Sequence, residues 1–504
     1  MATGIMASTF HVENFGCRAA RADGEAIGAR LRAAGHGELE GAGAELVVVN
    51  TCSVTAEADR AARAFIRRAH RMNPEARIVV TGCYAQRAPE ELAKLAGVAA
   101  VVGNSHKALA PEIALGLLAP ATQHTVKELV QIQATTLERA SSEQSAPSQV
   151  VWADDRFAHS FLEEAQVVPG TQTRPNLKIQ EGCGNRCTFC VIPTTRGPSK
   201  SLAGGAVLRQ VEGFVAAGGN ELVLSGINLG RWGREVSGAA PRNLAGLVRQ
   251  IFEQTALARL RLSSIEPMDW DAEMIALLAD FGGGRLARHA HLPLQSGSDA
   301  VLRRMHRRYR PWHYAEKVAA LRRAAGLELT VGADVMVGFP GETEAEFEET
   351  VALVRALKFG YLHLFPFSPR PGTPGWALHA ERPVPAEAVE ERMTALRVLA
   401  AEESLAHRRG FVGLELEAIT LHTSAERWAQ GRTAALTENF LPLEVDGCLP
   451  ANRLLRVRVT AVKADGRLEA AEAELAQYGA TAMPVSAKSV PLKSNSSPVS
   501  LASA

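Results

Sequence analysis

The sequence predicts an α/β protein of three parts: a parallel α/β domain at residues 8–118, a partial or full (β/α) barrel at 173–405, and a small β-barrel at 408–470. Short apolar runs alternate with helical stretches through the first two parts, which is typical of parallel sheets covered by helices. After residue 408 the helical pattern stops, and short alternating strands separated by turn residues favour a small barrel.

In the first part, two apolar strands end at single cysteines. ELVVVNTC ends at Cys52 and RIVVTGC ends at Cys83, and the stretch 56–72 between them is predicted to be a helix. A third cysteine, Cys17, follows the aromatic stretch ENFG. Ligands of parallel α/β sheets gather beyond the carboxyl ends of the strands, so the three thiols are placed where a ligand would bind.

The second part contains six apolar strand candidates, mostly separated by helical stretches: NLKIQ, ELVLSG, LRLSS, HAHLPLQ, LTVGADVMVG and YLHLFPFS. Such a repeat is typical of a parallel barrel. Residues 119–172, between the first two parts, are polar and irregular and are predicted to be a linker or an insertion. The Ser- and Pro-rich segment 484–504 is predicted to be a disordered tail.

Composition limits the possible partners and compartments. The 55 basic and 54 acidic residues are balanced, so contact with a nucleic acid must come from local patches. No apolar run approaches the roughly 18 to 20 residues that span a bilayer, and the first residues do not resemble a signal peptide, so a soluble, cytoplasmic protein is expected. Seven cysteines in such a chain favour metal ligands over disulfides.

The strongest motif is EGCGNRCTFCVIP, where Cys183, Cys187 and Cys190 follow the first strand of the barrel region. Three thiolates on one loop can bind three corners of an iron–sulfur cube and leave the fourth iron open. Zinc normally takes four protein ligands, or three and a water, and its cysteines usually occur as CxxC pairs. Because no second CxxC pair follows, an iron–sulfur site is favoured over a zinc site. Cys448 stands apart from the other cysteines and is predicted to be a turn or core residue.

This spacing, with Phe189 just before the last cysteine, resembles the radical S-adenosylmethionine superfamily. The resemblance implies a [4Fe–4S] cluster that binds and cleaves S-adenosylmethionine. It also implies cofactor contacts from Phe189 and from neighbouring strands, at Glu221, Ser225, Gly226, Gln295, Ser296 and, more weakly, Asp334. The alternatives are a surface charge for Glu221 and turn-forming roles for Gln295 and Ser296.

Cys17, Cys52 and Cys83, together with the CGNRCTFC loop and a C-terminal barrel similar to the RNA-binding TRAM domain, resemble the methylthiotransferases. The resemblance implies that these three cysteines hold a second [4Fe–4S] cluster, whose open iron carries the sulfur to be inserted. Taken singly, each is more simply a buried core cysteine. One departure is the run from Arg18 to Arg21, which lacks the asparagine that the family usually carries near the third position after the first cysteine.

Within that family, NTCSVTAEADR resembles the branch that acts on N6-threonylcarbamoyladenosine in tRNA. The resemblance implies insertion of a methylthio group at C2 of this base at position 37, beside the anticodon, with two molecules of S-adenosylmethionine used per product. Three alternatives stay open: N6-isopentenyladenosine in tRNA, an aspartate of a ribosomal protein, or a non-catalytic iron–sulfur protein that binds RNA.

The same resemblance implies a tRNA anticodon loop as partner, a flavodoxin- or ferredoxin-type electron donor, no membrane contact, and a monomer. Two arginine-rich stretches are predicted to contact phosphates. One is VLRRMHRRYR, and the other is the predicted helix after Cys52; their arginines are Arg303, Arg304, Arg307, Arg308 and Arg310, and Arg60, Arg63, Arg67, Arg68 and Arg71.

Overall fold

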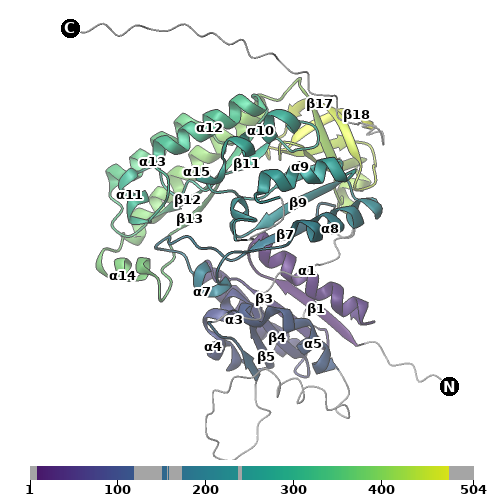
Figure 1. The fold of residues 1–504 in the computed structure, drawn as a ribbon, viewed down its shortest axis with the longest axis vertical. Helices are drawn as coiled ribbons and strands as arrows, with labels where there is room; N and C mark the ends of the chain where they lie inside the picture. The colour runs from purple at the N-terminus through teal and green to yellow at the C-terminus, as the bar shows by residue number, and fades with distance from the viewer. Residues whose placement is uncertain are drawn as a thin grey trace, which may run out of the picture.

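The computed structural model describes residues 8–475, apart from residues 42 and 156 and the segments 119–149, 158–172 and 236–240. Most of the predicted linker and all of the predicted tail lie outside these residues. Three α/β or β units follow one another along the chain (Figure 1). Among the described helices, none combines the length and apolar character needed to cross a membrane.

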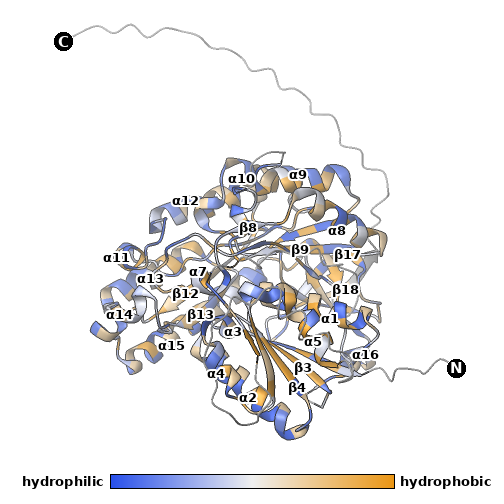
Figure 2. Cartoon of the chain, turned by 60° about the horizontal axis from the view of Figure 1, so that its bottom comes forward, coloured by the Kyte–Doolittle hydropathy of each residue, from blue (hydrophilic) through white to orange (hydrophobic). Residues whose placement is uncertain are grey.

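The N-terminal unit is a six-stranded sheet in which every pairing is parallel, as the sequence predicts. The order is β2-β1-β3-β4-β5-β6. The strands β3 and β4 each carry a run of apolar residues and are almost wholly buried, because helices cover both of their faces (Figure 2). The strands are β1 (Thr9–Asn14), β2 (Gly37–Glu38), β3 (Leu46–Thr51), β4 (Arg77–Gly82), β5 (Val98–Gly103) and β6 (Val150–Trp152).

The helices of this unit begin directly after the strands. The predicted helix forms as α2 (Ala56–Met72), where the Thr55 hydroxyl caps the first turn by accepting from the Ala58 amide at 3.2 Å. Its apolar side, including Phe65 and Ile66, packs on the sheet. The remaining helices are α1 (Arg18–Ala33), α3 (Cys83–Arg87), α4 (Pro89–Ala93), η1 (Asn104–Leu109) and α5 (Ala110–Leu118).

The central unit contains all six predicted strands, arranged as two parallel sheets that make a partial barrel. The first sheet has the order β10-β9-β7-β8, in which short β8 is antiparallel, and the second has the order β11-β12-β13. A bridge between Leu260 and Leu286 links the two sheets. The strands are β7 (Asn176–Glu181), β8 (Lys200–Ser201), β9 (Glu221–Gly226), β10 (Arg259–Leu262), β11 (His289–His291), β12 (Thr330–Val337) and β13 (Tyr361–Pro366).

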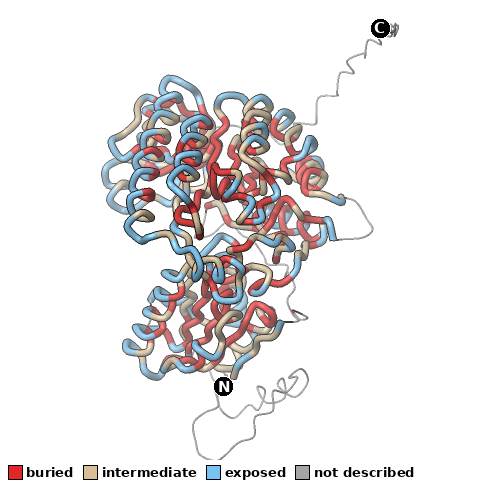
Figure 3. Tube along the Cα trace, turned by 90° about the vertical axis from the view of Figure 1, so that its left-hand side faces the viewer, coloured by how far each residue is buried: buried red, intermediate tan, exposed pale blue. Residues whose placement is uncertain are grey.

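Helices cover the outer side of these sheets, and a single buried core runs beneath them (Figure 3). The longest is α15 (Ala386–Arg409), which packs against β13 and leads to the last unit. The others are α7 (Ile192–Arg196), α8 (Gly204–Ala216), η2 (Leu229–Arg231), α9 (Leu244–Gln254), η3 (Pro267–Asp269), α10 (Ala272–Phe281), α11 (Asp299–Arg304), α12 (Pro311–Ala325), α13 (Glu344–Leu357) and α14 (Pro374–Glu381).

The C-terminal unit is a closed five-stranded barrel in the order β14-β15-β16-β18-β17, as predicted. It docks on the central unit through polar contacts: the side-chain amide of Asn220 donates to the Asn452 carbonyl at 2.8 Å, and Arg259 pairs with Glu417 at 2.6 Å. The elements are β14 (Glu415–Thr420), α16 (Ala425–Ala429), β15 (Arg432–Thr437), β16 (Pro442–Asp446), β17 (Leu454–Val462) and β18 (Leu468–Leu475).

Candidate iron–sulfur and cofactor site

The loop between β7 and α7 places Cys183, Cys187 and Cys190 together, and all three are half-buried. Backbone amides support the sulfurs: Asn185 N lies 3.4 Å from Cys183 Sγ, and Ile192 N lies 3.5 Å from Cys190 Sγ. Burial, and then the neighbouring thiolates, raises the pKa of Cys190 to about 12. Three soft donors on one tight loop fit an iron–sulfur cube with one open iron.

Two side chains from elsewhere in the central unit also reach these sulfurs. The Arg307 guanidinium is 3.1 Å from Cys187 Sγ, and its other amino group binds Glu266 at 2.6 Å. The Asn228 amide, just beyond β9, lies 3.5 Å from Cys183 Sγ. Donors of this kind orient sulfur ligands and tune the cluster that the ligands hold.

Cys17, Cys52 and Cys83 come together at one edge of the N-terminal sheet. The strands β1, β3 and β4 are neighbours, and their last residues are paired in register, so the residues that follow are adjacent. Gly16 shows how close the approach is: its φ is +119°, and a Cβ there would lie 2.9 Å from Cys52 Sγ. Burial, followed by the charges of Cys83 and Cys17, raises the pKa of Cys52 to about 12.

The central unit reaches across to this second cysteine set. Arg196, at the end of α7, places Nε 3.2 Å from Cys83 Sγ, and the Asn104 amide lies 3.4 Å from the same sulfur. Because Arg196 follows Cys190 by one short helix, the two cysteine sets lie on opposite sides of a single domain interface. The contacts of α3 with α7, and of α1 with β7, form that interface (Figure 1).

Arg196 belongs to a buried ionic network that spans the same interface. Its guanidinium contacts Glu181 and, at 3.2 Å, Asp23, while Lys107 and Lys178 contact the same two carboxylates. Three cations thus face two carboxylates among the described residues. The sulfur of Cys83, as a thiolate bound to iron, would supply the remaining negative charge.

The predicted cofactor contacts on the central unit have different surroundings. Gln295 has a φ of +63°, is 7% exposed, and its Oε1 has no described hydrogen-bond partner, which fits a group waiting for a ligand. Phe189 packs against the core. Ser296 is fully buried and its hydroxyl lies 3.2 Å from that of Thr350, so its contacts are within the fold.

Ser225 and Gly226 end β9 beside the cysteine loop. The Ser225 hydroxyl donates weakly to the Leu177 carbonyl at 3.4 Å and is buried. A Cβ at Gly226 would lie 2.8 Å from the side chain of Gln180, so the absence of a side chain there already has a packing reason. Ser225 and Gly226 thus lie where a cofactor could bind, but the contacts described for them are with other residues of the fold.

The interpretation of Glu221 as a contact for the cofactor's ammonium group does not fit its position. It is the first residue of β9, whereas the cysteine loop follows the last residue of the parallel strand β7. Its carboxylate is fully buried and pairs with Arg261 at 3.0 Å and with Arg174 at 3.6 Å. Glu221 therefore faces arginines at the start of β9 and not the cysteine loop, although its Oε2 has no hydrogen-bond partner among the described residues.

Asp334 lies on β12 within a group of aromatic and basic side chains. One carboxylate oxygen is 3.1 Å from His291 Nε2 and 3.2 Å from His363 Nδ1, and these bonds outweigh burial and lower the pKa of Asp334. The Tyr361 hydroxyl lies 3.0 Å from His291 Nδ1. These histidine contacts were not predicted, because the three strands that carry them are far apart in sequence.

The arginines of VLRRMHRRYR do not form the unpaired basic patch that the sequence predicts, because carboxylates from distant segments and one from α11 itself, Asp299, pair with them. Arg304 makes a two-pronged contact with Glu346 at 2.8 and 2.7 Å, and Arg307 is buried on Glu266. The remaining pairs are Arg303–Asp299 at 2.8 Å, Arg310–Asp299 at 3.2 Å and Arg308–Asp269 at 3.7 Å. By contrast, Arg60, Arg67, Arg68 and Arg71 on α2 are exposed and form no ion pair with described residues.

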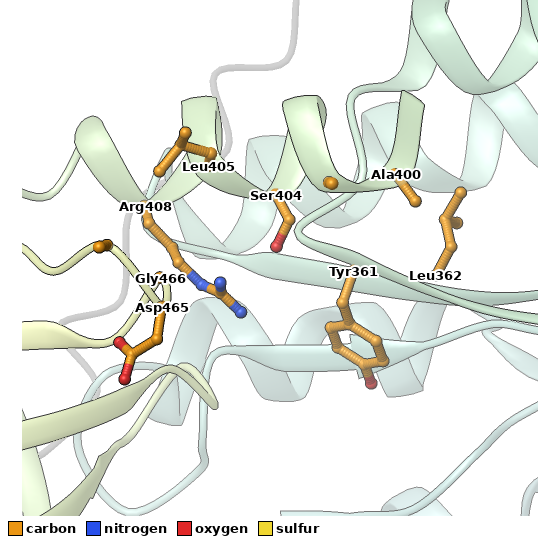
Figure 4. Close-up of a pocket in the computed structure, with 10 residues that line it drawn as sticks. Tyr361, Leu362, Ala400, Ser404, Leu405, Arg408, Asp465 and Gly466 are labelled. Carbon is orange, nitrogen blue, oxygen red and sulfur yellow. The ribbon is translucent and has the colours of Figure 1, made fainter. Parts of the chain in front are cut away.

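A separate pocket of about 370 Å³ lies where α15 meets the turn between β17 and β18 (Figure 4). Ser404 and Arg408 line it from the helix, and Asp465 from the turn. The Ser404 hydroxyl is already used, because it donates to the Gly360 carbonyl at 2.7 Å. No cysteine lines this pocket, so it is distinct from the site at the domain interface.

Sequence reasoning missed the groups that contact the sulfurs, namely Arg196, Asn104 and Asn228, and it missed the contact of Arg307. Each lies outside the spacing of a cysteine motif, and each finds its sulfur only through the fold. The one available signal was the short distance between Arg196 and Cys190 along the chain.

Comparisons with known proteins agree with this arrangement. The family described as "Uncharacterized protein family UPF0004" matches residues 9–103, and the radical SAM superfamily matches residues 177–354. Among solved structures, the radical S-adenosylmethionine methyltransferase TsrM from Kitasatospora setae has a TM-score of 0.48 and 16% identity, over 75% of this chain and 78% of that one. That likeness is too distant to bear on the site.

Curated relatives cover nearly the whole chain. The threonylcarbamoyladenosine tRNA methylthiotransferase MtaB of Bacillus subtilis is 34% identical over 87% of this chain and 91% of its own length. The tRNA-2-methylthio-N(6)-dimethylallyladenosine synthase of Erythrobacter litoralis is 33% identical over 82% of this chain and 87% of its own length. The chain therefore belongs to the radical S-adenosylmethionine methylthiotransferase family.

Proposed function

We propose that this protein is a tRNA methylthiotransferase that inserts a methylthio group at C2 of N6-threonylcarbamoyladenosine, at position 37 beside the anticodon. The observation that carries the proposal is the meeting of two three-cysteine sets across one domain interface, with Arg196 between them. Relatives named for this activity in Bacillus subtilis and Aquifex aeolicus, at 34% and 33% identity, support it.

Membership of the radical SAM superfamily implies a [4Fe–4S] cluster and S-adenosylmethionine. We assign Cys183, Cys187 and Cys190 to that cluster, and Cys17, Cys52 and Cys83 to a second one, because each set offers three thiols and leaves one iron open. When bound, the two clusters and S-adenosylmethionine supply an electron, a radical that removes the C2 hydrogen, and the sulfur and methyl group that replace it.

The chain's own residues hold this chemistry in place and keep water out. Arg196 and Arg307 are each buried, and each donates to one cysteine sulfur while an ion pair with a carboxylate holds the guanidinium in position. Gln295, just beyond β11 and bridged to Val335 of β12, has a side-chain oxygen with no hydrogen-bond partner among the described residues, and cofactor groups bind beyond strand ends in such folds. The target base must leave the anticodon stack to reach the interface.

The RNA contact is assigned to α2 and to the C-terminal barrel, which we propose is a TRAM-like domain. The exposed arginines of α2 recur at Arg60, Arg67, Arg68 and Arg71, so they share one side of the helix and can follow a phosphate backbone. A flavodoxin- or ferredoxin-type protein is proposed as the electron donor.

N6-isopentenyladenosine is the second candidate substrate, because relatives named for dimethylallyladenosine, a synonym of it, match about as well. Nucleoside mass spectrometry of tRNA from cells with and without the protein separates the two. We expect loss of the methylthio derivative of threonylcarbamoyladenosine and retention of the isopentenyl derivative; the opposite pattern would reject the proposed substrate.

Iron counting tests the cluster assignment on the purified, anaerobically reconstituted protein. Two cubes require about eight irons per chain, and a Cys52→Ala variant should retain about four. Cys448→Ala is the matched control, because Cys448 is exposed in the C-terminal unit, where its thiol donates to the Trp428 carbonyl at 3.3 Å. A count of four irons in the unsubstituted protein would reject the assignment of a second cluster.

A further inference from the structure

Three arginines from two domains converge beside the Cys17 end of the interface. Arg18 is the first residue of α1 and follows Cys17 directly, Arg174 precedes β7, and Arg261 lies in β10. The guanidiniums of Arg18 and Arg261 lie 5.6 and 5.3 Å from the ring centre of Phe440. Because Phe440 belongs to the turn between β15 and β16, all three units of the protein build this place.

Positive charge exceeds negative charge in this arginine cluster, formed by Arg18, Arg174 and Arg261. Arg174 and Arg261 share the single carboxylate of Glu221, which also lies 3.6 Å from Arg259. Arg18 is exposed, and it forms no ion pair with any described carboxylate. The single negative charge of Glu221 therefore cannot neutralise all of the guanidinium groups around it.

The other titratable neighbours do not supply the missing negative charge. Burial raises the pKa of Tyr361, so its phenol stays neutral at pH 7. Burial, and then the nearby arginine charges, hold the pKa of His289 well below its usual range, so this ring is neutral too. Asp334 is already occupied, since it accepts from His291 and His363.

The arginines are also short of hydrogen-bond acceptors. Arg261 is fully buried, and one of its terminal nitrogens has no hydrogen-bond partner among the described residues. Arg174 Nε, which is also buried, has no such partner either. Burial, and the charges of Arg261 and Arg18, lower the pKa of Arg174 to about 10. Buried guanidinium N–H groups without acceptors are costly, and their planar forks match carboxylate or phosphate oxygens.

We propose that Arg18, Arg174 and Arg261 bind an anionic oxygen group of the substrate nucleotide, which in N6-threonylcarbamoyladenosine is the threonyl carboxylate. The inference rests on the proposed function and deepens it, because the site adjoins Cys17. An isopentenyl group carries no charge and would leave the cluster unneutralised, so the same residues would select the acidic substituent over the apolar one. A backbone phosphate is the other possible source of the anion.

The test compares Arg18→Gln and Arg174→Gln with the unsubstituted holoprotein. Arg21→Gln is the matched control, because Arg21 lies on the same helix, is exposed, and among the described residues pairs with Glu25 alone, at 3.5 Å. Two synthetic anticodon stem–loops of one sequence carry threonylcarbamoyladenosine or isopentenyladenosine. Fluorescence anisotropy gives the Kd for each, and mass spectrometry of the product gives kcat/KM.

For the threonylcarbamoyl RNA, we expect both variants to raise Kd and lower kcat/KM by roughly 10- to 100-fold, the range of a lost hydrogen bond to a charged group. The isopentenyl RNA should be unaffected, and so should the Arg21→Gln control. Equal losses on both RNAs would overturn the carboxylate assignment in favour of a phosphate. Unchanged binding of both RNAs would overturn the site.

Failure of the proposed function is separable from failure of this inference. The unsubstituted protein alone reports on the former: methylthiolation of only the isopentenyl RNA would reject the proposed substrate whatever the variants do. Because Arg18 adjoins Cys17, its variant must keep the iron content and electron paramagnetic resonance signals of the unsubstituted protein. Arg174 is not adjacent to any cysteine in the sequence. If Arg174→Gln weakens binding as Arg18→Gln does, loss of the cluster is excluded as the cause.

Discussion

Cys183, Cys187 and Cys190 occupy one loop, whereas Cys17, Cys52 and Cys83 come from the ends of three strands. The first set needs only a local turn, in which the Cys190 amide donates to the Cys187 carbonyl at 3.1 Å. The second set exists only when the parallel sheet is folded and in register. One proposed iron site is thus encoded by sequence spacing and the other by the topology of the sheet.

The supporting groups sharpen this difference. Arg307 joins Cys187 to Glu266 entirely within the central unit. Arg196 instead leaves the central unit to reach Cys83, and its carboxylates come from both sides of the interface, at Glu181 and Asp23. The proposed sulfur-carrying site therefore depends on domain docking, which the radical site does not.

The largest expected effect separates the chemical roles of the two sets. Cys183→Ala should abolish cleavage of S-adenosylmethionine. Cys83→Ala should leave cleavage intact and abolish thiomethylation, because it removes a ligand only from the second set. Assay of labelled 5′-deoxyadenosine beside nucleoside mass spectrometry measures both, with Cys448→Ala expected to match the unsubstituted protein. Loss of cleavage in Cys83→Ala would mean that the sets do not act separately.

The next effect concerns stability at the interface. Arg196→Gln leaves Asp23 and Glu181 with only the two lysines and should lower the free energy of unfolding by about 3–5 kcal/mol, the usual cost of breaking a buried ion pair. Arg186→Gln, at an exposed residue of the cysteine loop, should change it by less than about 0.5 kcal/mol. Anaerobic urea unfolding measures both, and equal effects would contradict the buried network.

Acid should weaken the same interface. Burial alone would raise the pKa of Asp23 and Glu181, but Arg196 and the two lysines outweigh it and lower both values. A carboxylate with a lowered folded pKa stabilises the fold fully above its unfolded pKa of about 4, and this contribution is lost as pH falls further. Urea unfolding at pH 7 and below pH 4 should show a drop of about 1–3 kcal/mol.

A variant at the network tests this pH dependence directly. Glu181→Gln cannot gain a proton in this range, so it should start less stable at pH 7 and lose less stability on acidification than the unsubstituted protein. A parallel loss in both proteins would assign the acid sensitivity to other carboxylates.

The smallest expected effect is a shift in the reduction potential of each proposed cluster, tested by one substitution beside each. Asn104 donates to Cys83 at 3.4 Å and Asn228 to Cys183 at 3.5 Å, and such bonds stabilise the more negative, reduced cluster. Losing about 1 kcal/mol of hydrogen bonding corresponds to about 40 mV for one electron, so each Asn→Ala change should lower one potential by that amount. A redox titration followed by electron paramagnetic resonance should show each variant shifting a different cluster.

Local patterns predicted what depends on neighbours in sequence: the cysteine loop, α2 from residue 56 to 72, and the six strands of the central unit. The sequence did not reveal the carboxylates that pair with the arginines of VLRRMHRRYR, because several of them are remote; Glu346 lies 42 positions beyond Arg304. Glu221 failed for a related reason, since a position at the start of a strand does not reveal which edge of the sheet holds the ligand. Contacts such as Arg196 to Cys83, 113 positions apart, require the fold itself.

Phe440 adopts a φ of +71°, and its turn is anchored to the central unit by Asn439, whose amide donates to the Glu328 carbonyl at 2.9 Å. The ring lies against the guanidiniums of Arg18 and Arg261, and its centre is 4.5 Å from that of the His289 ring. The C-terminal barrel is consequently more than a detachable RNA arm. A chain shortened before residue 410 would remove Phe440 from Arg18 and Arg261, so supplying the barrel as a separate polypeptide would not restore turnover unless it docked again on the central unit.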